Sequence, residues 1–149
     1  MGEMSPPQPQ LQVRPARPAD QDQVWPLARD LATSYTAERP AFGQAFTAAL
    51  TDPDSLVLVA ERGGTILGYL LATTHPTFHA NAPVAWIEEV MVAPEHRATG
   101  IGRHLMTAAE TWARTRHAAY VALATRRAAS FYRALAYDES ATYFKKPLT

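Results

Sequence analysis

The sequence predicts a three-layer α+β fold, in which a mixed, mostly antiparallel sheet of about six or seven strands has helices on both faces. Two apolar, β-branched runs flank the pair Gly63-Gly64, a pattern typical of a β-hairpin. Residues 84–125 have the pattern of a strand, a helix and a strand, which makes those two strands parallel neighbours. Further helical patterns lie before and after these strands, so helices are available to cover both faces.

The elements follow one another as a strand, two helices, three strands, a helix, a strand, a helix and a strand. The first helix has Val24, Leu27 and Leu31 on one face and follows Asp20, a residue suited to cap it. The predicted elements are strand 11–17, helices 23–35 and 42–52, two strands within 55–74, strand 84–92, helix 100–116, strand 118–125, helix 128–137 and strand 140–148.

Length and composition set the domain organisation and exclude several classes of protein. The polar, proline-rich residues 1–10 are expected to form a disordered tail, and residues 11–149 a single domain. The chain has no cysteine, which rules out disulfides, thiolate metal sites and a cysteine nucleophile. The formal net charge is zero, so nothing global favours nucleic acid or an anionic membrane as a partner.

The sequence shows neither a targeting signal nor a metal-binding motif. No apolar run approaches the roughly 20 residues of a membrane span, and the first residues lack the pattern of a secretory signal. A cytoplasmic protein is therefore expected. The five histidines show no metal-binding spacing, so no metal site is expected.

The even charge balance hides an asymmetry between the two halves of the chain. Residues 1–74 carry five arginines and eight acids, whereas residues 97–133 carry seven arginines and a single acid, Glu110. This basic stretch is either a solvated face or a site for a polyanionic ligand.

Gly100 and Gly102 lie at the start of the predicted helix 100–116, beside Arg97. The first turn of a helix has about four unpaired backbone N–H groups and the positive end of the helix dipole. Glycines leave these groups open to a phosphate, so the junction predicts an anion site. Dinucleotide binding through G-x-G-x-x-G does not fit, because Leu105 stands at the third glycine position.

The segment "RATGIG", from Arg97 to Gly102, resembles the R-x-x-G-x-G signature of the GNAT superfamily of N-acetyltransferases. Its surroundings, "EEVMVAPEHRATGIGRHLM", resemble that family's strand, loop and following helix. The segment "AASFYRALAY" is similar to the family's A-x-x-x-Y-x-x-x-G-F segment, with the tyrosine at Tyr132, and "VRPARPADQDQVWPLA" resembles its first strand and helix. Together these segments cover most of the chain from about residue 12.

The resemblance implies a GNAT-like acyltransferase that moves an acetyl group from acetyl-CoA to a primary amine by direct attack, without a covalent enzyme intermediate. The acceptor is a small-molecule or peptide amine, and a homodimer is common in the family. Loop amides would bind the CoA pyrophosphate, and a strand backbone would pair with the pantetheine arm. The residues that the resemblance assigns to acetyl-CoA are Val90, Met91, Val92, Arg97, Ala98, Thr99, Gly100, Ile101, Gly102, Arg103, Thr125 and Tyr132.

Two adjacent carboxylates, Glu88 and Glu89, interrupt the apolar strand 84–92. A primary amine is mostly protonated at neutral pH, so a carboxylate that removes its proton assists attack on a thioester. Strict alternation points the two carboxylates to opposite faces and places Glu88 with Val90 and Val92. Glu88 is the favoured base, since its position resembles the one where several family members place the base or its hydrogen-bond partner. A structural ion pair is the alternative for Glu88 and the favoured role for Glu89.

Tyr132 matches the family's tyrosine that protonates the departing thiolate, and the alternative is that it only packs beside Phe131. Two positions depart from the family pattern. Thr125 stands where an asparagine often contacts CoA, and Ala136-Tyr137 replaces a glycine–aromatic pair, so the turn there must form without glycine.

No motif defines the acceptor. Aromatic residues in segments 34–46 and 75–83 hint at an acceptor with apolar bulk, and Trp86 is a further candidate for a pocket wall; the four aromatics are Tyr35, Phe42, Phe46 and Phe78. Two other functions stay open: a non-catalytic module that binds or senses acyl-CoA, and an interaction domain without a CoA site.

Overall fold

The computed structural model describes Gly2 and residues 9–149, so residues 1 and 3–8 of the predicted tail lie outside the described residues. The strands are β1 (Gln12–Pro15), β2 (Ser55–Arg62), β3 (Thr65–His75), β4 (Val84–Val92) and β5 (Val121–Leu123). The helices are α1 (Gln21–Leu31), α2 (Arg39–Thr51), α3 (Ile101–Thr115) and α4 (Ala129–Ala134), with short 3-10 turns at η1 (Pro18–Asp20) and η2 (Pro94–His96).

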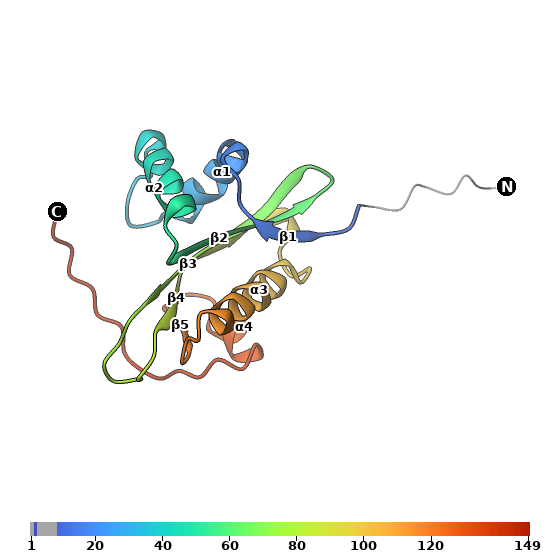
Figure 1. The fold of residues 1–149 in the computed structure, drawn as a ribbon. Coiled ribbons are helices and arrows are strands. Elements are labelled where there is room, and N and C mark those ends of the chain that lie inside the picture. Colours follow the sequence, from blue (N-terminus) through green and yellow to red (C-terminus); the bar gives the residue numbers. More distant parts are fainter. Residues whose placement is uncertain (1, 3–8) are drawn as a thin grey trace.

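The strands form one sheet in the order β1-β2-β3-β4-β5. Neighbours from β1 to β4 are antiparallel, and β4 and β5 are parallel. Helices α1 and α2 cover one face, and α3 and α4 lie on the other side of the sheet (Figure 1). The predicted three-layer α+β fold with a mixed, mostly antiparallel sheet is therefore confirmed.

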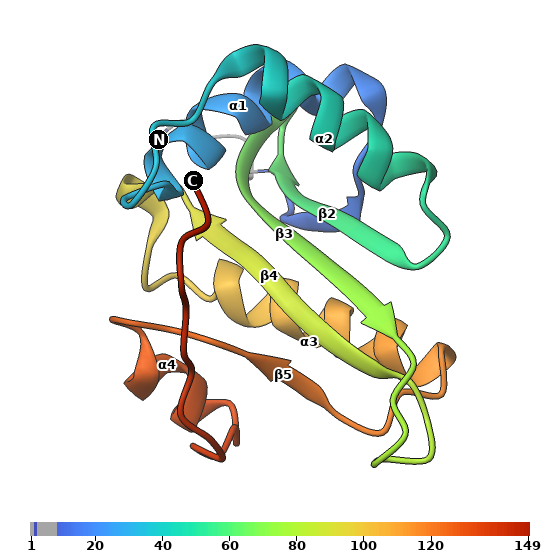
Figure 2. The same ribbon diagram turned by 90° about the vertical axis from the view of Figure 1, so that its left-hand side faces the viewer.

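The predicted strand count is too high. The sheet of the described residues has five strands rather than six or seven, because residues 140–148 do not form a strand. Residues 138–149, which we call the C-terminal segment, make no backbone–backbone hydrogen bond within the described part of the chain. The segment instead runs from α4 to the layer of α1 and α2 (Figure 2).

The turn between β2 and β3 forms as the sequence predicts. Gly63 and Gly64 both have positive φ angles, 58° and 84°. A two-residue hairpin turn with both central residues in this region matches the right-handed twist of the strands, and glycine adopts it without steric cost. Residues 55–62 and 65–75 are thereby paired into the centre of the sheet.

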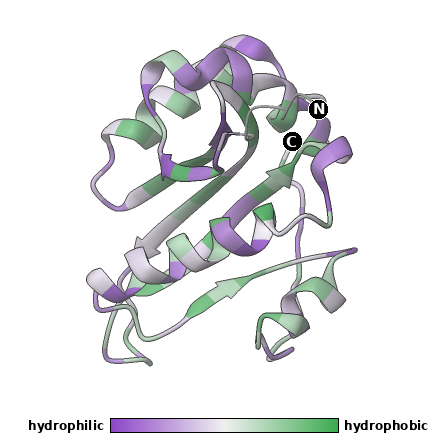
Figure 3. Cartoon of the chain, turned by 90° about the vertical axis from the view of Figure 1, so that its right-hand side faces the viewer, coloured by the Kyte–Doolittle hydropathy of each residue, from purple (hydrophilic) through white to green (hydrophobic). Residues whose placement is uncertain are grey.

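Each face of the sheet has its own hydrophobic cluster. Leu70 of β3 and two residues of α3, Ile101 and Leu105, are fully buried between the sheet and this helix. Val59 and Tyr69 are buried on the opposite face, against α1 and α2. In Figure 3 the helices carry both hydrophilic and hydrophobic residues, as expected of helices with one buried face.

Asp20 does not cap α1, contrary to the prediction. Its carboxylate is buried and binds the guanidinium of Arg14 at 2.7 and 2.9 Å, and it also accepts a hydrogen bond from the backbone of Arg17. The partly buried charge of Arg14 is neutralised by this carboxylate, which is therefore not directed at the start of α1. None of the helices among the described residues has the length and hydrophobicity that a membrane crossing requires.

Candidate active site

Strands β4 and β5 separate part-way along their length. β5 pairs with β4 only at Ala85, Trp86 and Ile87, and the two strands diverge beyond that point (Figure 2). The rest of β4 is paired with β3 alone. One edge of residues 88–92 is therefore free to hydrogen-bond with a ligand.

The direction of the backbone groups on this edge follows from one hydrogen bond. The N–H of Ala93 donates to the carbonyl oxygen of Leu67 at 2.8 Å. This bond continues the β3–β4 pairing by one residue beyond the pair of Val92 and Gly68. Because backbone groups alternate along a strand, Met91 also faces β3, whereas Val90 and Val92 face the open edge. Of the three residues predicted to pair with the pantetheine arm, these two have the required orientation, and Met91 supplies a buried side chain.

Arg97 folds back onto the end of β4. Its Nε donates to the carbonyl oxygen of Val92 at 3.2 Å, and its Nη2 lies 3.7 Å from the sulfur of Met91. The guanidinium thus braces the loop between β4 and α3.

A β-bulge separates the two glutamates. Leu71 of β3 pairs with Glu89 and Ala72 pairs with Ile87, so Glu88 is an extra residue with no partner. Ile87 and Val90 consequently pack on the same face, although strict alternation would put them on opposite faces. Because the bulge interrupts the alternation at Glu88, parity with Val90 and Val92 no longer fixes the face of Glu88, and its placement stays a prediction.

The bulge gives the two carboxylates different surroundings. Glu88 is exposed, whereas Glu89 is partly buried on the face covered by α1 and α2. The hydroxyl of Tyr69, a residue that is 3% exposed, donates to Oε1 of Glu89 at 2.6 Å. Burial, and next the negative charge of Glu89, raise the pKa of Tyr69, so this hydroxyl stays a donor. Glu89 is therefore held in one orientation by a neutral partner.

The start of α3 has the open amides that an anion site needs. The first helical bond runs from the N–H of His104 to the carbonyl of Gly100, at 3.0 Å. The N–H groups of Ile101, Gly102 and Arg103 make no hydrogen bond within the described residues. Gly100 has a φ of 90°, and a Cβ placed on it would meet nothing within 4 Å, so the space above the amides is open.

Gly102 is required for a different reason from the one that the sequence suggested. A Cβ at this position would lie 3.1 Å from Cζ of Phe131, a residue of α4. Glycine therefore lets Phe131 pack closely against the first turn of α3.

Two further residues that the resemblance assigns to CoA flank the first turn of α3. Ala98 lies in the loop with a φ of 61°, and Thr99 donates its hydroxyl to the carbonyl of His96.

Among the seven arginines of residues 97–133, Arg133 is the one that forms an ion pair within the described residues. Most of this basic stretch is therefore free to neutralise an anion.

Tyr132 lies on α4, on the same side of the sheet as the open amides. Its ring packs edge-to-face with Phe131 and Tyr137, at centroid distances of 4.9 and 5.9 Å. Its hydroxyl makes no hydrogen bond within the described residues, and burial raises its pKa. The group is thus a protonated donor without a protein partner.

The two positions that depart from the family pattern are both accounted for. The hydroxyl of Thr125 accepts a hydrogen bond from the N–H of Ala128 at 3.1 Å, which closes the turn before α4. Ala136 adopts a φ of 70°, the left-handed conformation that glycine would take without strain.

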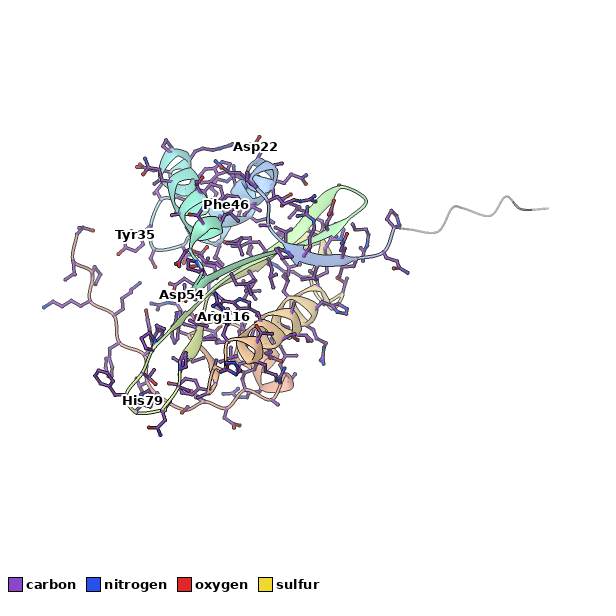
Figure 4. All side chains as sticks on the ribbon, in the orientation of Figure 1. Asp22, Tyr35, Phe46, Asp54, His79 and Arg116 are labelled. Carbon is purple, nitrogen blue, oxygen red and sulfur yellow. The ribbon has the colours of Figure 1, made fainter. Side chains whose placement is uncertain are left out.

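The predicted acceptor aromatics do not gather in one place. Phe46 is 5% exposed and belongs to the core, where Phe42 packs against it at 5.6 Å. Phe78 is fully exposed on the loop between β3 and β4. Tyr35, on the connection between α1 and α2, is 60% exposed and lies near the C-terminal segment (Figure 4).

Comparison with known proteins identifies the family. The model of the acetyltransferase (GNAT) family matches residues 22–137. The chain belongs to the GNAT family. This GNAT chain is 32% identical over 146 residues to the aminoalkylphosphonate N-acetyltransferase of Salmonella typhimurium, covering 94% of this chain and 93% of that protein. It is 26% identical over 103 residues to the mycothiol acetyltransferase of Pseudarthrobacter chlorophenolicus, of which it spans 32%.

Solved structures of the family share the fold. The aminoglycoside N-acetyltransferase AAC(6')-Iy, in complex with CoA, superposes with a TM-score of 0.85 at 18% identity, covering 98% of this chain and all of that one. The predictions of a GNAT-like fold and of an acyltransferase are confirmed, and acetyl-CoA as co-substrate is consistent with the family. The individual site residues stay predictions.

The sequence analysis missed Tyr69 and the bulge at Glu88. The register between β3 and β4 brings Tyr69 opposite Met91 and diagonal to Glu89. Tyr69 has the appearance of an ordinary core residue in its own strand, so a signal would have required the pairing of β3 with β4 in advance.

Proposed function

We propose that this GNAT protein transfers an acetyl group from acetyl-CoA to a primary amine of a small molecule. The observation that carries the proposal is the junction of β4 and α3, where an unpaired strand edge meets three free amides at a helix start. A strand edge fits the amide-containing pantetheine arm, and helix amides beside unpaired arginines fit its phosphates. The relative from Salmonella, named as an aminoalkylphosphonate N-acetyltransferase, supports a small-molecule acceptor.

In the proposed mechanism, the chain binds one substrate on each side of β4. The N–H groups of Ile101, Gly102 and Arg103 hold the pyrophosphate, and the edge groups of Val90 and Val92 orient the thioester end. Acetyl-CoA supplies an acetyl thioester, the electrophile that a neutral amine attacks. The N–H of Val90 stabilises the negative charge that develops on the carbonyl oxygen.

The two proton transfers take place on opposite sides of β4. Glu89 takes the proton that the amine loses, directly or through a water, while Tyr69 keeps one of its oxygens fixed. Tyr132 donates its proton to the departing sulfur. We assign the base to Glu89 rather than to the favoured Glu88, because Glu89 is oriented and partly buried whereas Glu88 is exposed at the bulge.

A calorimetric titration tests the cofactor half of the proposal. Wild-type protein is titrated with acetyl-CoA, with NADH as a control ligand, and the variant Gly100→Glu places a bulky anion in the open space above the amides. We expect micromolar binding of acetyl-CoA, loss of that binding in the variant and no binding of NADH. Circular dichroism of the variant checks that it is folded. Absence of acetyl-CoA binding by the wild type would contradict the proposal.

A release assay for free CoA tests the catalytic half. Amines of varied size are added with acetyl-CoA, and we expect CoA release that depends on the amine. Saturable acetyl-CoA binding without release for any amine would instead identify a sensing module.

A further inference from the structure

The side of β4 that carries Glu89 also carries Trp86. Ile87 packs into the cluster under α3, so its neighbour Trp86 points to the opposite face. Glu89 lies on that same face, where it meets Tyr69. Trp86 and Glu89 are three residues apart, about 10 Å along a strand. A small acceptor amine at Glu89 therefore has Trp86 within reach.

The C-terminal segment covers this face at two points. Tyr143 stacks on Trp86 at a centroid distance of 6.4 Å and an interplanar angle of 21°. Two residues further on, Nζ of Lys145 lies 6.0 Å from the ring centroid of Tyr35. The segment thus joins β4 to the connection between α1 and α2, and it runs from α4 past the end of β4 (Figure 2).

Their contacts distinguish the two lysines. Tyr143 and Lys145 are two positions apart, and both contact the body of the protein. Phe144, between them, is 87% exposed. Lys145 therefore lies against the connection between α1 and α2, whereas Lys146 makes no ion pair or cation–π contact within the described residues.

Among the described residues, the charge of Lys145 has no acidic partner. The chain has two lysines, Lys145 and Lys146, and neither forms an ion pair within the described residues. The Lys145 ammonium instead lies over the ring of Tyr35, which attracts a cation without neutralising it. An anionic group on a ligand would supply the missing charge.

We propose that the C-terminal segment forms a wall of the acceptor site and that Lys145 determines specificity by binding an anionic group of the acceptor. The acceptor is then a small primary amine that also carries a carboxylate or a phosphonate, with its linker against Trp86 and Tyr143. This inference rests on the proposed function, and it names the substrate class.

Initial-rate kinetics on three short amines test this inference. The amines are propylamine, which has no anionic group, β-alanine, which has a carboxylate, and 2-aminoethylphosphonate. The variant Lys145→Met removes the charge and keeps the apolar stem, and Lys146→Met is its matched control. We expect lower KM values for the two anionic amines in the wild type. Lys145→Met should raise those KM values about fivefold, the scale of a solvent-accessible ion pair. It should leave kcat and the KM for propylamine unchanged, and Lys146→Met should change none of these values.

A comparison of β-alanine with 2-aminoethylphosphonate shows whether the site prefers a carboxylate or a phosphonate. The variant Lys145→Glu gives a second readout. That variant should weaken the anionic amines further and favour 1,3-diaminopropane. Equal KM values for propylamine and the anionic amines, or equal effects of Lys145→Met and Lys146→Met, would overturn the inference while leaving acetyl transfer in place. A wild type that binds acetyl-CoA but acetylates none of the amines would overturn the proposed function as well.

Discussion

Tyr132 and Tyr137 offer a direct test of the proposed general acid, because the two phenols differ in one respect that the structure defines. The hydroxyl of Tyr132 has no hydrogen-bond partner within the described residues, whereas that of Tyr137 donates to Glu110 at 2.6 Å. Both lie on the α4 side and contact each other edge-to-face. Removal of each hydroxyl should therefore affect a different property of the protein.

For Tyr132→Phe we expect kcat to fall by at least about a hundredfold, the lower end of the range for general acid catalysis. The free energy of unfolding should stay within about 0.5 kcal/mol of wild type, since no hydrogen bond is lost. Burial raises the pKa of Tyr132, so its hydroxyl is protonated throughout the neutral range and the fall should be the same from pH 6 to 8.

For Tyr137→Phe we expect the opposite result. A hydrogen bond to a partly buried carboxylate contributes about 1.5 kcal/mol, so the melting temperature should fall by about 5 °C while kcat is retained. The measurements are amine-dependent CoA release and thermal unfolding followed by circular dichroism. If Tyr132→Phe binds acetyl-CoA and turns over like the wild type, the assignment of the acid is wrong.

Three further predictions concern the base, a strained turn and a buried ion pair. Glu89→Gln should lower kcat/KM by at least about a hundredfold in the release assay, whereas Glu88→Gln should leave it unchanged; the reverse pattern would return the base to Glu88. Ala136→Gly should raise the melting temperature by about 2 °C, because relief of the left-handed alanine exceeds the added chain entropy by about 0.5 kcal/mol, and a lower value would contradict the strain. The hydrogen bond from Arg14 lowers the pKa of Asp20 in the folded state, so this carboxylate adds stability above its unfolded pKa and the stability is lost as pH falls through the folded pKa. In urea unfolding, Asp20→Asn should cost about 3 kcal/mol at pH 7 and less below pH 4, and a cost independent of pH would refute this linkage.

Local patterns predicted most of the elements because their causes are local. The turn at Gly63-Gly64 needs two residues with positive φ, and the pair supplies them wherever the hairpin lies. The apolar face of the first helix and the glycine at the start of α3 were found for the same reason. The final strand was not, since a strand needs an edge to pair with, and residues 140–148 pair with none.

The candidate site shows where local reasoning ends. The loop from Arg97 to Gly102 carries its pattern in consecutive residues, so the anion site could be located from the sequence. Alternation alone could not fix the face of Glu88, because the bulge belongs to the pairing of two strands and not to either of them. Gly102 likewise has its reason in Phe131, a residue 29 positions away.

The sequence by itself determined the family, the layers and the residue types at the junction of β4 and α3. The tertiary structure decided which carboxylate is oriented by Tyr69, which edge of β4 is open, and that Lys145 lies over the ring of Tyr35. The first set follows from turn geometry, periodicity and motif, which act over a few residues. The second depends on contacts between segments far apart in the chain, and these exist only once the sheet has chosen its register and the layers have packed.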